Sequence, residues 1–208
     1  MSDTQNVNDN FVTAFGPPDE PAVPLRFTEQ FLEENWQRRH QRTGAGWFLG
    51  RFFFLLGEGL NHFTPCLEAW SFLLSPPAAE RRIIGYNAYG ALLILENETE
   101  EGLVAPVRLL EPTNVIYWGD SECVYGTLLN RWLPRRHMPH FFETSVYEQW
   151  LKTSGRFLGD DEILGIHAAL PLGGEMKLEN FTPINIIDYY RATGPAYAKA
   201  HHQRERGE

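Results

Sequence analysis

Residues 82–95 read RIIGYNAYGALLIL, and this apolar stretch around Gly90 is the clearest β region of the chain. It ends in the polar run ENETEEG at 96–102, which predicts a hairpin turn. Further strands are predicted at 103–110 and 114–118. Because these strands follow one another without an intervening helix, they predict an antiparallel meander.

Segments on both sides of this β region have different patterns. Proline-rich residues 11–24 predict extended, irregular chain, and aromatic residues 47–56 predict one buried strand or two short ones. Helices are predicted from apolar spacing and capping residues at 27–42, 64–74, 120–132, 143–151 and 183–201. Strands therefore gather in the middle, and the expected fold class is α+β, with a central antiparallel β-meander flanked by helices in two closely packed subdomains.

The composition limits the classes of partner. The chain has 208 residues, 43% of them hydrophobic, and a formal net charge of −9. This charge disfavours direct contact with nucleic acid or an anionic membrane, and it favours a basic protein partner. The most apolar run, 52–56, is too short to span a bilayer, and the polar first ten residues do not resemble a secretory signal. With Cys66 and Cys123 predicted to be buried free thiols, we expect a cytoplasmic protein.

A search for reaction chemistry finds no phosphate-binding loop, no nucleophile elbow and no zinc-protease motif. We therefore expect a protein that is not an enzyme, without catalytic residues, cofactor or metal. Two alternatives remain open. His137 and His140 could bind a metal together with Glu143, although Pro139 interrupts their alignment. His167, in an apolar segment, is predicted to be a hydrogen-bonded core histidine, and the alternative is a catalytic group.

Acidic side chains form three groups along the chain, and these are the candidate binding residues. They are Glu96, Glu98, Glu100 and Glu101, then Asp120 and Glu122, then Asp160, Asp161 and Glu162. Each group is either a solvated loop or part of a negative surface that meets lysine and arginine on a partner.

Aromatic side chains have the same ambiguity. Residues 52–54 and the six tryptophans are expected in the core, and the alternative is the lining of a ligand pocket. Tyr189, Tyr190 and Tyr197 are candidates for exposed contact, because tyrosine is enriched at interface hot spots. The apolar spacing of the last helix also makes Tyr190 a core candidate.

The order of several motifs resembles a bacterial family. Five segments of this chain resemble the first part of that family, the GAD-like domain. They are Phe15–Pro18, Phe31–Trp36, Gly50–Leu56, Leu67–Trp70 and Ile84–Leu92. Three segments resemble the second part, which is the C-terminal domain named after type VI DNase immunity proteins. They are Gly165–Gly174, Glu179-Asn180 and Ile186–Tyr190.

This resemblance implies a GAD-like domain at 11–118 and an immunity-type helical domain at 119–202. It also implies a function, because members of the family are encoded beside secreted toxins, several of them nucleases, and bind the cognate toxin. The resemblance therefore predicts an immunity protein that neutralises a type VI secretion toxin by protein–protein contact, and it supplies no catalytic residue. The alternative from the residues themselves is a small-ligand-binding or enzymatic α+β domain that uses the aromatic centre as a pocket.

Overall fold

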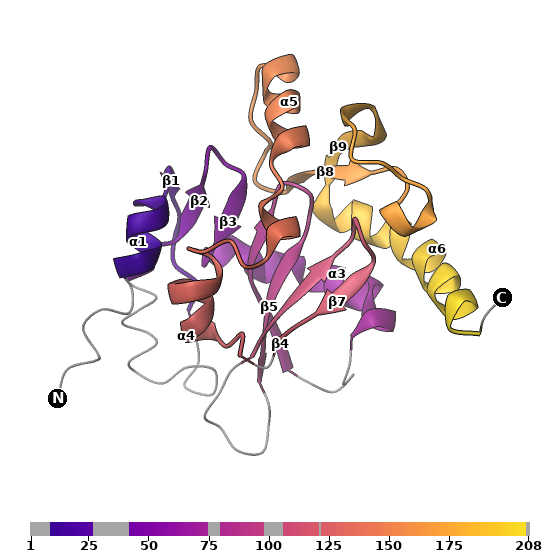
Figure 1. Ribbon diagram of the computed structural model, residues 1–208, viewed down its shortest axis with the longest axis horizontal. Coiled ribbons are helices and arrows are strands. Elements are labelled where there is room, and N and C mark those ends of the chain that lie inside the picture. Colours follow the sequence, from indigo (N-terminus) through magenta and orange to yellow (C-terminus); the bar gives the residue numbers. More distant parts are fainter. Residues whose placement is uncertain (1–8, 27–41, 75–79, 98–105, 121, 207–208) are drawn as a thin grey trace.

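A seven-stranded antiparallel sheet forms the centre of the computed structural model, which describes residues 9–26, 42–74, 80–97, 106–120 and 122–206 (Figure 1). The strands lie in chain order, each hydrogen-bonded to the next. They are β1 (Glu20–Pro21), β2 (Gly46–Phe48), β3 (Phe53–Leu55), β4 (Glu80–Asn87), β5 (Leu92–Asn97), β6 (Val107–Glu111) and β7 (Ile116–Trp118). The predicted α+β fold with a central antiparallel meander is confirmed.

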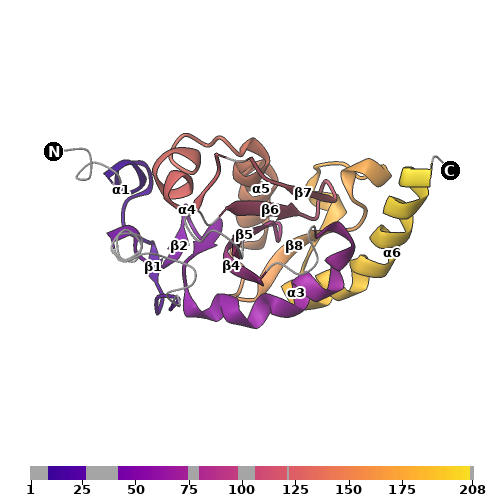
Figure 2. The same cartoon turned by 90° about the horizontal axis from the view of Figure 1, so that it is seen from below.

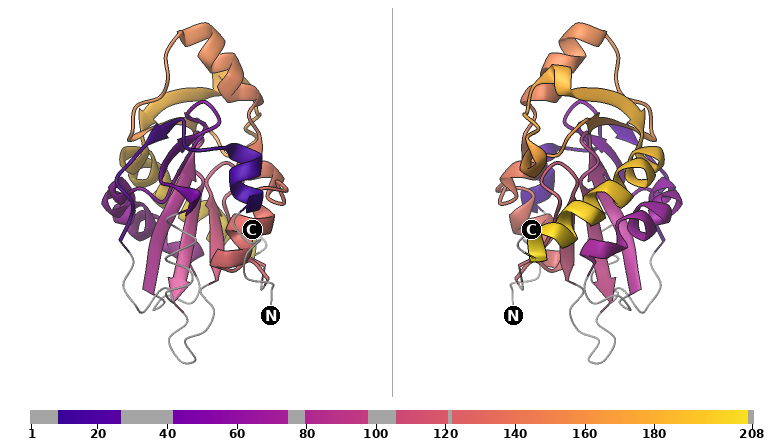
Figure 3. Two further views of the ribbon diagram at one scale, coloured as in Figure 1. Left: turned by 90° about the vertical axis from the view of Figure 1, so that its left-hand side faces the viewer. Right: turned by 90° about the vertical axis from the view of Figure 1, so that its right-hand side faces the viewer.

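Helices and short helical turns cover the sheet. They are α1 (Asp9–Phe15), η1 (Glu58–Phe63), α3 (Thr64–Ala69), η2 (Ser71–Leu73), α4 (Tyr125–Thr127), η3 (Leu128–Trp132), η4 (Pro139–Phe142), α5 (Ser145–Ser154), η5 (Leu170–Leu172), η6 (Leu178–Asn180) and α6 (Ile186–Arg206). A second sheet pairs β8 (Glu162–Ile166) with β9 (Phe181–Asn185). In Figure 2, α3 runs along one side of the main sheet, and α4 and α5 lie on the other. Figure 3 shows α6 crossing the molecule diagonally beside α3, with which it is in contact.

The two central strands are buried on both faces. All residues from Ala91 to Glu96 in and beside β5 are buried, as are Ile83 to Asn87 in β4. An antiparallel strand covered on one face shows alternating polar and apolar residues, whereas cover on both faces needs a continuous apolar run. The layers on either side of the sheet therefore explain why the stretch 82–95 is apolar almost throughout.

A tight turn lies inside this stretch, between β4 and β5. Asn87, with only 1% of its surface exposed, organises it: the side-chain oxygen accepts hydrogen bonds from the N–H groups of Tyr89 and Ala91, each at 3.0 Å. Its amide nitrogen donates to the carbonyl oxygen of Phe141 at 2.9 Å. Gly90 has a φ of 80°, a left-handed conformation that glycine adopts without steric cost. The buried asparagine thus satisfies the backbone of a turn that water does not reach.

The second half of the chain packs onto this turn through buried hydrogen bonds. The N–H of Leu164 donates to the carbonyl oxygen of Ala88 at 2.7 Å, and the N–H of Tyr147 donates to the hydroxyl of Tyr89 at 2.9 Å. The hydrophobic core is continuous across residue 118, with buried side chains from both predicted domains. The two parts of the chain therefore share one core.

The start of the described chain differs from the prediction of extended structure. Residues 9–15 form α1, because Phe11 and Phe15, four positions apart, lie on one helix face with ring centroids 4.8 Å apart. Both rings pack on the sheet, Phe11 against Phe48 and Phe15 against Phe53. The prolines that follow keep the chain extended through β1, as predicted. The helix expected at 27–42 lies almost entirely outside the described residues.

The last helix also begins later than predicted. Pro183 lies in β9, and α6 starts at Ile186, where the side-chain oxygen of Asn185 accepts hydrogen bonds from the N–H groups of Ile187 and Asp188. The prediction that three tyrosines of this helix form an exposed contact is wrong. Tyr189, Tyr190 and Tyr197 are at most 5% exposed, because they face the sheet and β8 and are part of the core.

Several other segments match their predictions with shifted bounds, while most of the hairpin turn predicted at 96–102 lies outside the described residues. The stretch 47–56 forms two short strands, β2 and β3, and α5 follows its predicted range closely. Both cysteines are buried free thiols, as expected. Among the described helices, none combines the length and apolar character needed to cross a bilayer.

Candidate functional site

A pocket of about 500 Å³ opens at the β1 end of the sheet. Its walls come from the chain around β1, from β2 and β3, from η1, and from the loop that precedes β8. Residues that lie far apart in the sequence, near positions 20, 50, 60, 86 and 160, thus come together around one pocket. The volume lies within the usual range of ligand-binding pockets, roughly 300–1,000 Å³.

One wall of the pocket is aromatic. It consists of Trp47, Phe54, Phe63 and Tyr86, which pack on one another with ring centroids 5.1 to 5.8 Å apart. Gly57 adds to this packing, since a Cβ atom there would lie 2.2 Å from the ring of Phe54. Edge-to-face packing of this kind holds the rings rigidly. Trp47, Phe63 and Tyr86 are at most 2% exposed, so Phe54, which is partly exposed, is the ring that the wall presents to a guest.

The rim of the pocket is acidic. Glu20 comes from β1, Glu58 from η1, and Asp160 and Asp161 from the loop before β8. The structure thus brings two predicted acidic residues, Asp160 and Asp161, together with two carboxylates that the sequence did not single out. No local pattern could have found Glu20 and Glu58, because each is far along the chain from the Asp160–Asp161 pair.

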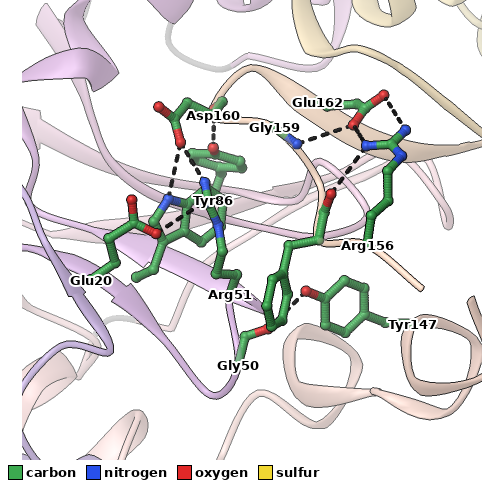
Figure 4. Close-up of polar contacts among 11 residues, drawn as sticks. Glu20, Gly50, Arg51, Tyr86, Tyr147, Arg156, Gly159, Asp160 and Glu162 are labelled. Atoms are coloured by element: carbon green, nitrogen blue, oxygen red, sulfur yellow. Dashed lines mark hydrogen bonds and ion pairs between the residues drawn. The ribbon is translucent and has the colours of Figure 1, made fainter. Parts of the chain in front are cut away.

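Arg51 contacts residues from three parts of the pocket rim (Figure 4). Its guanidinium donates to Glu20 at 2.9 Å and to Asp160, and it lies 4.7 Å from the ring centroid of Trp47. The indole N–H of Trp47 also donates to Asp160, at 3.3 Å. Arg51 has a φ of 62°, which costs a non-glycine residue about 1 kcal/mol. These contacts hold its side chain above the tryptophan face.

Hydrogen bonds hold the loop that carries Asp160 and Asp161 in place at both ends. Arg156 forms two hydrogen bonds to Glu162, at 2.6 and 2.9 Å, and these hold the pKa of Glu162 below its usual value (Figure 4). The hydroxyl of Tyr86 donates to the backbone carbonyl of Asp160. Burial, followed by the nearby charges of Asp160 and Asp161, raises the pKa of Tyr86 well above its usual value. Glu162, the third predicted residue of this group, therefore supports the loop and does not line the pocket.

The prediction that Glu96 belongs to an exposed acidic turn is wrong. The residue is 2% exposed, because β5 continues through it and places its carboxylate between two arginines. Arg81 donates to it at 2.7 Å and Arg108 at 3.1 Å, and the hydroxyl of Tyr117 donates as well. Glu96 is thus part of a buried ion network across β4, β5, β6 and β7.

The other acidic candidates do not line the pocket in the described part of the chain. Asp120 accepts a hydrogen bond from the N–H of Glu122 at 2.7 Å in the turn before α4, and Glu122 pairs with Arg131 at 3.4 Å. Glu98, Glu100 and Glu101 lie outside the described residues.

His167 is placed differently from its prediction as a core residue. His167 is exposed, and its Nε2 lies 2.6 Å from the hydroxyl oxygen of Thr182, so it is not a core residue. His62, which the sequence did not single out, lines the pocket. Among the described residues, which include His137, His140 and Glu143, no three histidine, cysteine or acidic side chains gather to hold a metal.

Comparison with known proteins adds support for the fold. The sequence matches no family model and no curated protein. The structure is similar to the crystal structure of Atu4351 from Agrobacterium tumefaciens, with a TM-score of 0.59 and 15% sequence identity. The similarity covers 90% of this chain and 88% of that chain. At this level of identity the likeness shows that the two chains share a fold.

Proposed function

We propose that this chain is a cytoplasmic immunity protein that binds and neutralises a cognate type VI secretion toxin by protein–protein contact. A nuclease is the class of toxin that we favour. The observation that carries the proposal is the pocket, which combines an acidic rim with a rigid aromatic wall. The motif order described above supports the family, and the net charge of −9 supports a basic partner.

Charge and aromatic surface contribute different parts of such a complex. A nuclease must hold a phosphate backbone, so its active surface is basic, and an acidic inhibitor reaches it quickly by electrostatic steering. Exposed charges contribute little affinity, whereas a desolvated aromatic centre contributes much of it. The pocket places carboxylates around an aromatic wall whose Phe54 ring is partly exposed, which suits both needs.

The test is complex formation with the product of the neighbouring open reading frame. We expect this product to arrest growth when expressed alone, and co-expression with the present chain to restore growth. The two purified proteins should also elute together from a size-exclusion column. Absence of both rescue and co-elution would contradict the proposal.

A small-ligand-binding domain is the second candidate, and the volume and aromatic wall of the pocket favour it. The predicted catalytic histidine of this alternative, His167, does not line the pocket. A thermal-shift screen of small organic cations against wild type and Trp47→Phe tests the alternative. Stabilisation at micromolar concentration that disappears in the variant would support a small molecule as the natural occupant.

A further inference from the structure

Two carboxylates of the pocket have no cationic partner in the described part of the chain. Glu58 and Asp161 are exposed, and neither side chain forms a hydrogen bond or ion pair with another described residue. Glu20 and Asp160, by contrast, are paired with Arg51. As far as the described residues go, the pocket therefore has one neutralised side and one side with two uncompensated negative charges beside the same aromatic wall.

A contact within the molecule shows which chemical group suits a pocket that has carboxylates beside an aromatic ring. Arg51 lies 4.7 Å from the centre of the Trp47 ring while its guanidinium contacts two carboxylates. A planar guanidinium can stack on an aromatic face and donate to carboxylates at its edge at the same time, whereas an ammonium group has no flat face to stack. Beside the two carboxylates that have no partner among the described residues, the partly exposed ring of Phe54 supplies an aromatic face for the same kind of contact.

We propose that the pocket accepts one arginine side chain from the basic protein partner, with Glu58 and Asp161 as its charge partners and the partly exposed ring of Phe54 as its stacking surface. This inference rests on the proposed function, since it names the chemistry of the contact. Burial of the inserted side chain places it at the centre of the interface, where arginine and aromatic residues contribute most of the binding energy. The acidic rim excludes an anionic guest.

The pocket can be tested alone with N-acetyl-arginine N-methylamide as the probe and the uncharged citrulline analogue as its control. The reporter is the indole N–H signal of Trp47 in a two-dimensional NMR spectrum, assigned by its loss in Trp47→Phe. We expect saturable shifts with the arginine probe and about fivefold weaker binding of the citrulline analogue. Equal binding of the two probes, or no shift with either, would overturn the inference.

Matched variants identify the charge partners. Glu58→Gln combined with Asp161→Asn removes both charges without changing size, and we expect it to weaken the arginine probe about fivefold. Glu179→Gln removes an exposed carboxylate on η6, away from the pocket, and should leave binding unchanged. Equal thermal midpoints of the three proteins establish that the fold is intact. Unchanged probe binding in the double variant would refute the assignment of these residues.

The same variants separate this inference from the proposed function. A partner that binds wild type and the double variant with equal affinity would refute the arginine contact and leave the immunity function standing. Saturable probe binding without a complex with the neighbouring gene product would reject the immunity function, while the pocket would keep its preference for a guanidinium.

Discussion

The hydroxyl of Tyr190 on α6 donates a hydrogen bond to the carbonyl oxygen of Gly90, at 2.8 Å, across 100 residues of sequence. Tyr190 is fully buried, and burial raises its pKa well above the usual value. The bond joins the last helix to the turn at the centre of the main sheet. It is therefore part of the packing that connects the two halves of the chain.

Removal of this bond should destabilise the protein. Tyr190→Phe leaves the carbonyl of Gly90 buried without its donor, so we expect the free energy of unfolding to fall by about 2 kcal/mol. Urea unfolding followed by tryptophan fluorescence measures the change. Thr153→Val, which removes an exposed hydroxyl, is the control and should stay within about 0.5 kcal/mol of wild type. Equal effects of the two variants would contradict this account.

Substitution of the turn residue Asn87 should lower the free energy of unfolding even more than Tyr190→Phe does. Asn87→Ala removes three buried hydrogen bonds and leaves two backbone N–H groups without an acceptor, so we expect a loss of about 3 kcal/mol. Thermal unfolding monitored by circular dichroism measures it. Asn61→Ala, at an exposed position, should change little. A stable Asn87→Ala protein would mean that the turn does not depend on this side chain.

Glu96 is expected to act on stability and not on partner binding. Glu96→Gln keeps the shape of the side chain but leaves Arg81 and Arg108 without the carboxylate that balances them, at a cost of about 3 kcal/mol. Urea unfolding measures the cost, and partner affinity below the transition should equal that of wild type. Weaker partner binding by a fully folded Glu96→Gln protein would return this residue to the interface.

Stability should decline at alkaline pH. Burial raises the pKa of the Cys66 and Cys123 thiols to about 12, from 9.0 for an exposed thiol. Below pH 9 both states are protonated and stability is complete; between pH 9 and 12 the unfolded chain releases protons first, so stability falls as pH rises. At pH 10 the loss is about 1 kcal/mol for each thiol. Urea midpoints should fall less steeply between pH 8 and 10 in Cys66→Ala/Cys123→Ala than in wild type; identical slopes would contradict this origin.

Charge reversal at the pocket rim should slow capture of the partner. Asp161→Lys replaces a negative charge that has no partner among the described residues with a positive one, and we expect association with the neighbouring gene product to slow about threefold and to depend less on salt. Stopped-flow fluorescence at several salt concentrations measures both. Glu179→Lys makes the same charge change away from the pocket. Equal association rates for the two variants would remove the loop from the interface.

Periodic segments were predictable from the sequence, and segments controlled by distant contacts were not. The meander and α5 follow from local apolar spacing, and the structure has them. The turn at Asn87–Ala91 lacks an exposed polar signature, because its polar groups are satisfied from within by a buried side chain and by Phe141. The burial of Glu96 depends on arginines from two neighbouring strands, which no local pattern reveals.

Some residues of the candidate site were predictable from the sequence, and others were not. Asp160 and Asp161 stand out as adjacent carboxylates in a loop, and both line the pocket. Among their aromatic neighbours, Trp47 was expected in the core, and it is only 2% exposed although it borders the pocket. Glu20 and Glu58 are brought to the rim by β1 and η1, so their role follows from tertiary packing and could not be found from spacing.

The turn at Asn87–Ala91 also sets when the chain can become functional during synthesis. Its hydrogen-bond partners lie at Phe141, Tyr147, Leu164 and Tyr190, all translated after it. A ribosome needs about 5–20 s to add the 100 residues between Gly90 and Tyr190. During that interval the central strands have η1 and α3 on one side but lack the cover that comes from the later helices, so the turn gains its full set of hydrogen bonds only after α6 has been made.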